Sequence, residues 1–255
     1  MNTPPKIMVD TGIVSTGLAD PARWEFVDDT ICPLSNKLKI YRIRSRKASV
    51  EELIAVQAIG RAARNKEIAL YEYSELRWES WNGYQSLVQS HSPLYAFQDV
   101  IWYSVPSPIE RAHFFESDNW CKGSEVDRFM TFLLKTDSRS LHEYMCRDCN
   151  FSDFERQCAS KISLFQLICN TLGVNKARDC YHLWACECNM LDFFITADTK
   201  FFNSYTNAIK QKKFYLNCTV IKPINFVELL NISREGITIP EPGKMFLANG
   251  LECTS

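Results

Sequence analysis

Short apolar runs alternate with helical patterns along the chain, and their lengths predict alternating strands and helices. Residues 7–10 read as a short buried strand that ends in Asp10. Further strands are expected at 68–73, 193–196 and 214–221. Strands that alternate with helices imply a mainly parallel sheet with helices on both faces. The expected fold class is therefore α/β.

Helix signals lie between these runs. Ser49 and Glu52 form a capping-box pattern, and apolar residues continue at helical spacing to about Asn65. Residues 39–44 alternate between polar and apolar, which predicts an exposed strand or hairpin. Further helices are expected over 74–83 with Ser74 as cap, 124–134, 154–167, 177–190, 203–210, and 226–231 with Asn225 as cap.

The composition is that of a globular chain. With 255 residues, 46% of them hydrophobic, the chain can bury a sizeable core, which argues against intrinsic disorder. The formal net charge is −1, so any nucleic-acid binding must come from local basic patches. No run approaches the roughly 18 apolar residues that a membrane helix needs, and residues 1–6 carry no signal-peptide pattern. We expect a soluble protein of the cytoplasm.

The cysteines are numerous but irregularly spaced. Their number, eleven, is odd, and without an export signal we expect reduced thiols that act as small buried hydrophobes. Cys146 and Cys149 have the spacing of a zinc knuckle or a redox motif. A second such pair is missing from the sequence, although Cys121, His142 and Cys158 could complete a site. A structural zinc ion is therefore an alternative rather than the main expectation.

Three acidic residues stand out because of their place relative to these elements. Asp10 and Asp198 lie at or just past strand ends, where α/β folds have their functional crevice. Asp179 falls in the first turn of a helix, where the helix dipole favours a negative charge. Mg²⁺ and Mn²⁺ prefer carboxylate oxygens, and metals held in this way can hydrolyse a phosphodiester. The hydroxyl of Thr196 could orient one of these carboxylates.

Each acid also has an ordinary structural interpretation. Asp10 could be a turn residue, Asp179 a helix-start charge and Asp198 the start of a loop. Glu75 and Glu79 lie on an expected surface helix, where solvated glutamates are common. The order of the acids, rather than any one of them, favours a functional interpretation.

That order resembles the pattern of the PIN-domain family of metal-dependent ribonucleases, which includes the toxins of bacterial toxin–antitoxin modules. The matching segments are Val9-Asp10-Thr11 near the start and Ser74 to Glu79 in the middle. Near the end, the match runs from Asp179 to Asp198, includes Tyr181-His182 and Ala185, and is followed by Phe201-Phe202. The last matching segment is Pro223 with residues 226–230. The resemblance covers about residues 6–83 and 166–232. It implies a single three-layer α/β/α domain over 1–255, with an extra hairpin at about 26–45 and a mostly helical insertion at about 84–165.

The resemblance also implies roles for individual acids. Asp10, Asp179 and Asp198 would bind Mg²⁺ or Mn²⁺. Glu79 would be the fourth, middle acid, with Glu75 as the alternative. These acids would together carry the hydrolysis.

Other residues would assist the acids. Thr11, Thr196 and His182 would support them, although a histidine in such a place more often packs or hydrogen-bonds than binds a metal. Local cations would guide the RNA, and Tyr and Trp side chains could stack on bases. The cations are Arg42, Arg44, Arg46, Lys210, Lys212 and Lys213.

The chain departs from the family pattern in two ways. The family often has a further acid two positions after the last Asp, where this chain has Lys200, which weakens the expectation of a second firmly held metal. The chain is also much longer than a minimal PIN domain, so the insertion leaves the substrate and the partners open.

Three functional classes follow. The leading hypothesis is a hydrolase, a metal-dependent endoribonuclease of toxin or defence type, with an antitoxin, another protein or a second copy as partner. The second is a PIN-like scaffold that has lost useful metal binding and docks through its Cys-rich insertion. The third is a zinc-stabilised adaptor built around Cys146 and Cys149.

Overall fold

The computed structural model describes residues 3–15, 18–20, 24–27, 40–43, 48–83, 94–114 and 123–247. The chain forms two compact units that alternate along the sequence. The first unit comprises residues 1–10, 69–82 and 102–222. The second unit comprises residues 11–68, 83–101 and 223–255.

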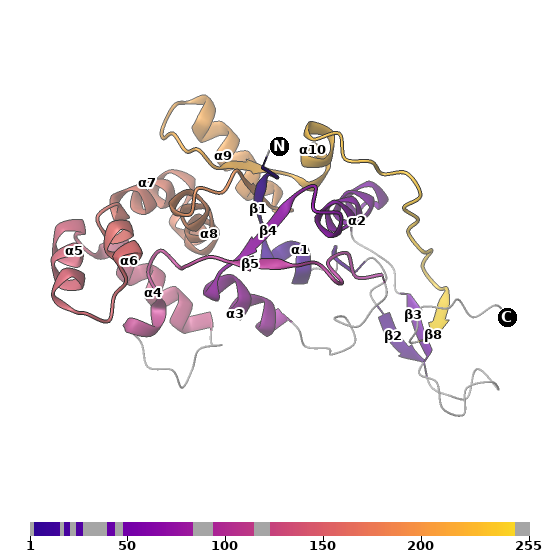
Figure 1. Cartoon of the computed structure of the whole chain (residues 1–255), viewed down its shortest axis with the longest axis horizontal. Helices are drawn as coiled ribbons and strands as arrows, with labels where there is room; N and C mark the ends of the chain where they lie inside the picture. The colour runs from indigo at the N-terminus through magenta and orange to yellow at the C-terminus, as the bar shows by residue number, and fades with distance from the viewer. Residues whose placement is uncertain are drawn as a thin grey trace. The chain divides into compact units, whose positions relative to one another are not determined.

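A five-stranded, all-parallel sheet forms the centre of the first unit (Figure 1). Its order is β5 (Trp102–Ser104), β4 (Ala69–Glu72), β1 (Lys6–Val9), β6 (Phe193–Ile195) and β7 (Thr219–Ile221). The predicted α/β class and parallel sheet are confirmed. The edge strand β5 was not predicted, and it lies in the segment that the sequence had marked as an insertion. The last strand is shorter than the predicted 214–221, because only its final three residues pair with β6.

The five strands all run in the same direction, but the chain adds them first on one side of β1 and then on the other. From β1 the sheet continues through β4 to β5 on one side and through β6 to β7 on the other. Val9 pairs with Ile195, so β1 and β6 end at the same level. In open α/β sheets, ligands bind beyond the carboxyl ends of the strands at such a switch point. The residues directly after Val9 and Ile195 therefore lie where a ligand site is expected.

Helices and short 3₁₀ turns make up most of the rest of the first unit. They are α3 (Ser74–Gly83, of which residues to 82 belong here), η3 (Arg111–His113), α4 (Gly123–Lys135), α5 (Ser138–Arg147), α6 (Asp153–Ala159), α7 (Ile162–Leu172), η5 (Val174–Lys176), α8 (Ala177–Cys188) and α9 (Thr199–Lys210). The predicted helix 154–167 is split in two. A capping box of Ser152 and Glu155 starts α6, which ends at Ala159 before α7 begins.

The core of the first unit is centred on α8. Most of this helix is buried, namely Ala177 and all residues from Cys180 through Cys186. Trp184 and Tyr181 are fully buried and contact the ring of Phe165, whose centroid lies 5.5 Å from that of Trp184. Burying each such side chain contributes about 2–3 kcal/mol. Because α8 is held on nearly every side, the polar residues that it carries have fixed positions.

The second unit contains the helix that the sequence predicted best. In α2 (Val50–Arg64), the side chain of Ser49 accepts a hydrogen bond from the backbone N–H of Glu52, and the carboxylate of Glu52 accepts one from the backbone N–H of Ser49, which confirms the capping box. The helix packs against α10 (Pro223–Leu229). The expectation that Asn225 caps this last helix is wrong, because α10 begins at Pro223, and proline suits the first helical position. A short helix, α1 (Thr11–Ser15), also belongs to this unit.

A three-stranded antiparallel sheet completes the described part of the second unit. It consists of β2 (Trp24–Val27), β3 (Ile40–Ile43) and β8 (Met245–Leu247), with β3 in the middle. The pairing of β2 with β3 confirms the predicted hairpin, whereas β8 was not predicted. Among the residues that the structure describes, no helix is both long and apolar enough to cross a membrane.

Candidate functional site

Strands β1 and β6 bring Asp10 and Thr196 together. The backbone N–H of Asp10 donates to the carbonyl of Ile195 at 2.8 Å, which extends the pairing of the two strands by one residue. The hydroxyl of Thr196 then donates to Oδ2 of Asp10 at 2.6 Å. Both side chains are buried. Asp10 is thus a buried carboxylate at the switch point of the sheet.

The same hydroxyl connects Asp10 to Asp198. Oγ1 of Thr196 accepts a hydrogen bond from the backbone N–H of Asp198 at 3.1 Å. Oδ1 of Asp198 accepts from the backbone N–H groups of Lys200 and Phe201, at 2.6 and 3.0 Å, and so caps α9. This capping is the reason that α9 begins at Thr199, four residues before the predicted start. Asp198 is an exposed residue, so its carboxylate is accessible at the rim of the site.

Asp179 lies in the first turn of α8 and is half-buried. Within the described part of the chain, no donor is hydrogen-bonded to its carboxylate. Burial raises its pKa to about 6; the negative charge of Asp10 acts in the same direction and the charge of His182 in the opposite one. Asp198 and Glu79 raise the pKa further. The four predicted acids therefore share one electrostatic neighbourhood.

Glu79 forms a chain of hydrogen bonds with the buried side chains of His182 and Tyr73, and is itself partly exposed. Nε2 of His182 lies 3.0 Å from Oε2 of Glu79, and Nδ1 lies 2.6 Å from the hydroxyl of Tyr73. Burial alone would lower the pKa of His182, but Glu79, assisted by Asp10 and Asp179, raises it to about 9. At neutral pH the imidazole is therefore protonated and donates to Glu79. The histidine is a hydrogen-bonding partner of the middle acid.

Glu75, the alternative to Glu79, is occupied elsewhere. Its Oε1 accepts from Nε of Arg111 at 2.8 Å, and both side chains are buried. Burial raises the pKa of Glu75, and the hydrogen bond and positive charge of Arg111 oppose that effect. Glu75 and Glu79 are four residues apart on α3, and Glu79 is among the groups that raise the pKa of Asp179 most. The geometry thus favours Glu79 as the middle acid and gives Glu75 a structural partner.

The acids have the donor chemistry of a site for a hard divalent cation, but they are not gathered tightly. Carboxylate and hydroxyl oxygens suit Mg²⁺ and Mn²⁺. Asp179 adds a carboxylate that lacks a hydrogen bond from the described residues. However, among the described residues no three His, Cys, Asp or Glu side chains are close enough to hold a metal ion as they stand. The oxygen donors are of the kind that Mg²⁺ and Mn²⁺ prefer, but the side chains that the structure describes would have to move closer together to hold an ion.

The remaining predicted site residues lie elsewhere or cannot be placed. Thr11 begins α1 in the second unit. Arg42 lies in β3, also in the second unit, whereas Arg44 and Arg46 fall outside the described residues. Lys210 ends α9, which is about 18 Å long at 1.5 Å per residue, and Asp198 caps the other end. Lys212 and Lys213 follow Lys210, so these three lysines are not beside the acids.

The cysteines near the insertion do not assemble a metal site in the described residues. Sγ of Cys146 lies 3.6 Å from Nε2 of His142, and Cys149 is an exposed free thiol. Cys158 is buried, and Cys121 falls outside the described residues. The eight cysteines that the structure describes are free thiols.

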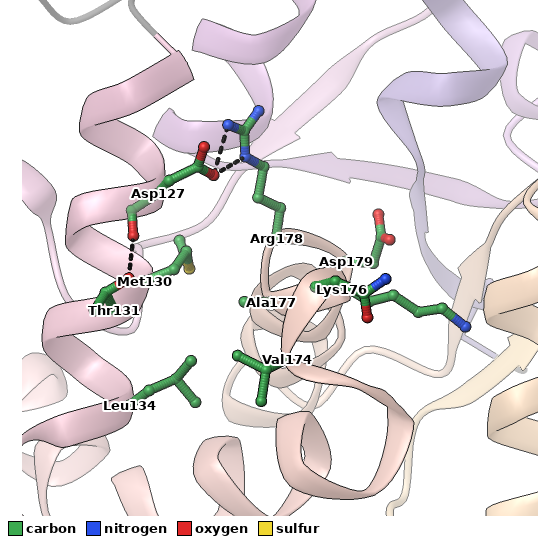
Figure 2. A pocket seen from close by; sticks show the side chains of 10 residues that line it. Asp127, Met130, Thr131, Leu134, Val174, Lys176, Ala177, Arg178 and Asp179 are labelled. Carbon is green, nitrogen blue, oxygen red and sulfur yellow. Dashed lines mark hydrogen bonds and ion pairs between the residues drawn. The ribbon is translucent and has the colours of Figure 1, made fainter.

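Sequence reasoning missed a pocket of about 420 Å³ beside Asp179. One wall is formed by Asp127, Met130, Thr131 and Leu134 of α4, and the other by residues 174–179 of η5 and α8 (Figure 2). The α4 residues follow the spacing i, i+3, i+4 and i+7, which marks one face of a helix. That spacing was visible in the sequence, but nothing in it indicated that the face would line a cavity.

Comparison of the chain with protein-family models, with curated proteins and with solved structures finds no match in any of the three. The candidate site is therefore interpreted from its own geometry.

Proposed function

We propose that the first unit is a metal-dependent endoribonuclease of the PIN type, which hydrolyses RNA phosphodiester bonds. The observation that carries this proposal is the Thr196 hydroxyl, which bonds to Asp10 at 2.6 Å and to the backbone of Asp198 at 3.1 Å. It holds two acids together at the switch point of a parallel sheet, where α/β proteins bind their ligands. RNA as the substrate rests on the sequence resemblance.

Each acid has a role in this proposal. Asp10, Asp179 and Asp198 would hold Mg²⁺ or Mn²⁺, and Glu79 would complete the group of carboxylates. When bound, such an ion supplies a water of lowered pKa and neutralises negative charge on a phosphate. Thr196 fixes the carboxylate of Asp10 in one orientation, and His182 does the same for Glu79.

The charges of the neighbourhood support the need for a cation. Asp10, Asp198 and Glu79 all raise the pKa of Asp179 through their negative charge, and His182 opposes them. A phosphodiester would be repelled by this excess of negative charge. Cleavage is therefore expected to disappear completely when the metal is removed.

The test is cleavage of end-labelled single-stranded and structured RNAs by the full chain with Mn²⁺, with Mg²⁺ and with EDTA. Asp10→Asn should abolish metal-dependent cleavage. Asp99→Asn is the matched control, because Asp99 is exposed in the second unit and its φ of 58° is one that asparagine adopts readily. Full activity of Asp10→Asn, or cleavage that persists in EDTA, would refute the proposal.

A second candidate is a PIN-like scaffold without catalysis. Three observations favour it: no three described donors are close enough to hold a metal as they stand, Glu79 is already paired with His182, and Lys200 stands where the family often has an acid. This alternative predicts no heat of Mn²⁺ binding in calorimetry and no cleavage of any RNA. Mn²⁺ binding that Asp10→Asn removes would contradict it.

A further inference from the structure

The pocket beside Asp179 has two apolar walls that face each other. Leu134 of α4 and Val174 of η5 point toward each other across the space in Figure 2. Met130 and Ala177 extend these two walls. Val174 is 56% exposed, so its side chain is accessible to a ligand. A slot between apolar walls is the shape that accepts a flat ring.

Polar groups surround this slot. Arg178 and Asp127 form an ion pair at one edge, with Nη2 and Oδ1 2.7 Å apart (Figure 2). The hydroxyl of Thr131 donates to the carbonyl of Asp127 at 2.7 Å, which leaves its oxygen as an acceptor. The amide of Asn175 offers both a donor and acceptors. These groups match the mixed donors and acceptors on the edge of a nucleobase.

Asp179 connects the pocket with the candidate site, although its carboxylate points away from Leu134 and Val174, along the other side of α8 (Figure 2). This residue lines the pocket and also belongs to the neighbourhood of Asp10 and Asp198. The volume, about 420 Å³, lies in the range of small-molecule sites, about 300–1,000 Å³. The sugar and phosphate of a base in the slot would have to pass the start of α8, beside Asp179, to reach the acids.

We infer that this pocket is a nucleotide subsite, which holds a base next to the bond that the acids cleave. The inference rests on the proposed function, and it deepens it by naming the part of the RNA that is recognised. It also gives the insertion a role. Helix α4, which lies inside the predicted insertion at 84–165, supplies one wall of the subsite. The base would pack between Leu134 and Val174, and its edge would form hydrogen bonds with Thr131 and Asn175.

The first experiment isolates the pocket from the metal chemistry. Adenosine and uridine 5′-monophosphates are titrated against the full chain in EDTA, with inorganic phosphate in a parallel titration. Val174→Glu should weaken mononucleotide binding at least tenfold, because it adds a negative charge to the slot. Val174→Trp should do the same by filling it. Leu229→Glu is the matched control, because Leu229 is also 56% exposed but lies in the second unit.

The second experiment measures metal-dependent RNA cleavage by the same variants. Mononucleotide binding that both Val174 variants lose, with cleavage slowed at least tenfold, supports the subsite. No mononucleotide binding by the wild type, or wild-type binding by both variants, overturns it even if cleavage is normal. Binding equal to that of inorganic phosphate also overturns it, because the base would then contribute nothing. Mononucleotide binding without any cleavage refutes the nuclease, and with it the role of the pocket on a substrate.

Discussion

The hydroxyl of Thr196 donates a 2.6 Å hydrogen bond to Oδ2 of Asp10, although 186 residues separate the two in the sequence. The bond is buried, and it forms only because β1 and β6 run side by side and end at the same level. It makes Thr196 a positioning residue for the carboxylate that the proposed function requires most.

Replacing Thr196 with valine tests this role. The side chain keeps its shape and loses its hydroxyl, so Asp10 and the backbone of Asp198 each lose a partner. Outer-shell partners of this kind typically contribute about 10–100-fold to metal affinity or activity. We expect cleavage to fall by this factor and the free energy of unfolding by about 1–3 kcal/mol. Thr196→Ser keeps the hydroxyl and should restore most of the activity. Equal activity of the valine and serine variants would contradict the role.

Asp179→Asn should stabilise the protein while it abolishes cleavage. The pKa of Asp179 is raised from 3.8 to about 6, so the folded state binds its proton more tightly than the unfolded state does. The stability from this group is fully present below pH 4 and is lost as the pH rises through 6. At pH 7 the variant should therefore be more stable by about 1–2 kcal/mol, which allows for partial exposure of the carboxylate.

Urea denaturation at pH 4 and pH 7 measures this difference. The gain of Asp179→Asn should be absent at pH 4 and complete at pH 7. A variant that is less stable than wild type at pH 7 would show that the carboxylate has a stabilising partner.

Because His182 is hydrogen-bonded to Glu79, the free energy of unfolding should fall as the pH rises into the alkaline range. The pKa of the buried imidazole is raised from 6.5 to about 9, so its contribution is fully present below pH 6.5 and is lost as the pH rises through 9. The largest contribution is about 3 kcal/mol. We expect His182→Gln to remove this pH dependence. Glu79→Gln should reduce it, because the carboxylate is the main source of the shift.

The measurement is the free energy of unfolding of the three proteins from pH 6 to pH 9.5. Wild type and His182→Gln should converge at the alkaline end. Parallel curves over the whole range would show that His182 is neutral in the folded protein.

Gly60→Ala tests the packing of the second unit, because the variant can be either more or less stable than wild type. In an open helix position this change would stabilise by about 1 kcal/mol. In α2, however, a Cβ at Gly60 would lie 1.8 Å from the carbonyl oxygen of Ala96. The same oxygen accepts from Arg64 at 2.6 Å, so it is held in place. We therefore expect a loss of about 1–3 kcal/mol, as for other overpacked sites.

Thermal or chemical unfolding of Gly60→Ala gives the answer directly. A midpoint above that of wild type would mean that the segment around Ala96 moves away from α2 without cost. Cleavage of RNA, which is assigned to the first unit, should be measured in the same variant below its unfolding transition, and it should stay at the wild-type level.

The sequence predicted correctly those helices and strands that are determined by residues within or next to them. The capping box at Ser49 and Glu52 fixes the start of α2 by itself, and the sequence located it correctly. The apolar runs that end at Asp10 and before Asp198 were found for the same reason. The strand β5 could not be found, because it has three residues, two of them exposed, and is a strand only through its pairing with β4.

The candidate site shows the same division. The sequence brought Glu79 and Glu75 forward as alternatives and had no means to choose between them. The choice depends on Arg111 and His182, which reach α3 from distant segments of the chain. The start of α9 was placed too late because Asp198 serves both as an acid of the site and as a helix cap.

The separation of Asp10 from Thr196 also has a consequence for synthesis. Strand β1 leaves the ribosome before its partner β6, which follows 186 residues later. At about 5–20 residues per second, the interval is about 10–40 s. During this time β1 has one unpaired edge, and the acids have not met. A nascent or truncated chain that ends before Phe193 would therefore carry no assembled acid cluster, so the proposed activity would belong only to chains translated beyond Asp198.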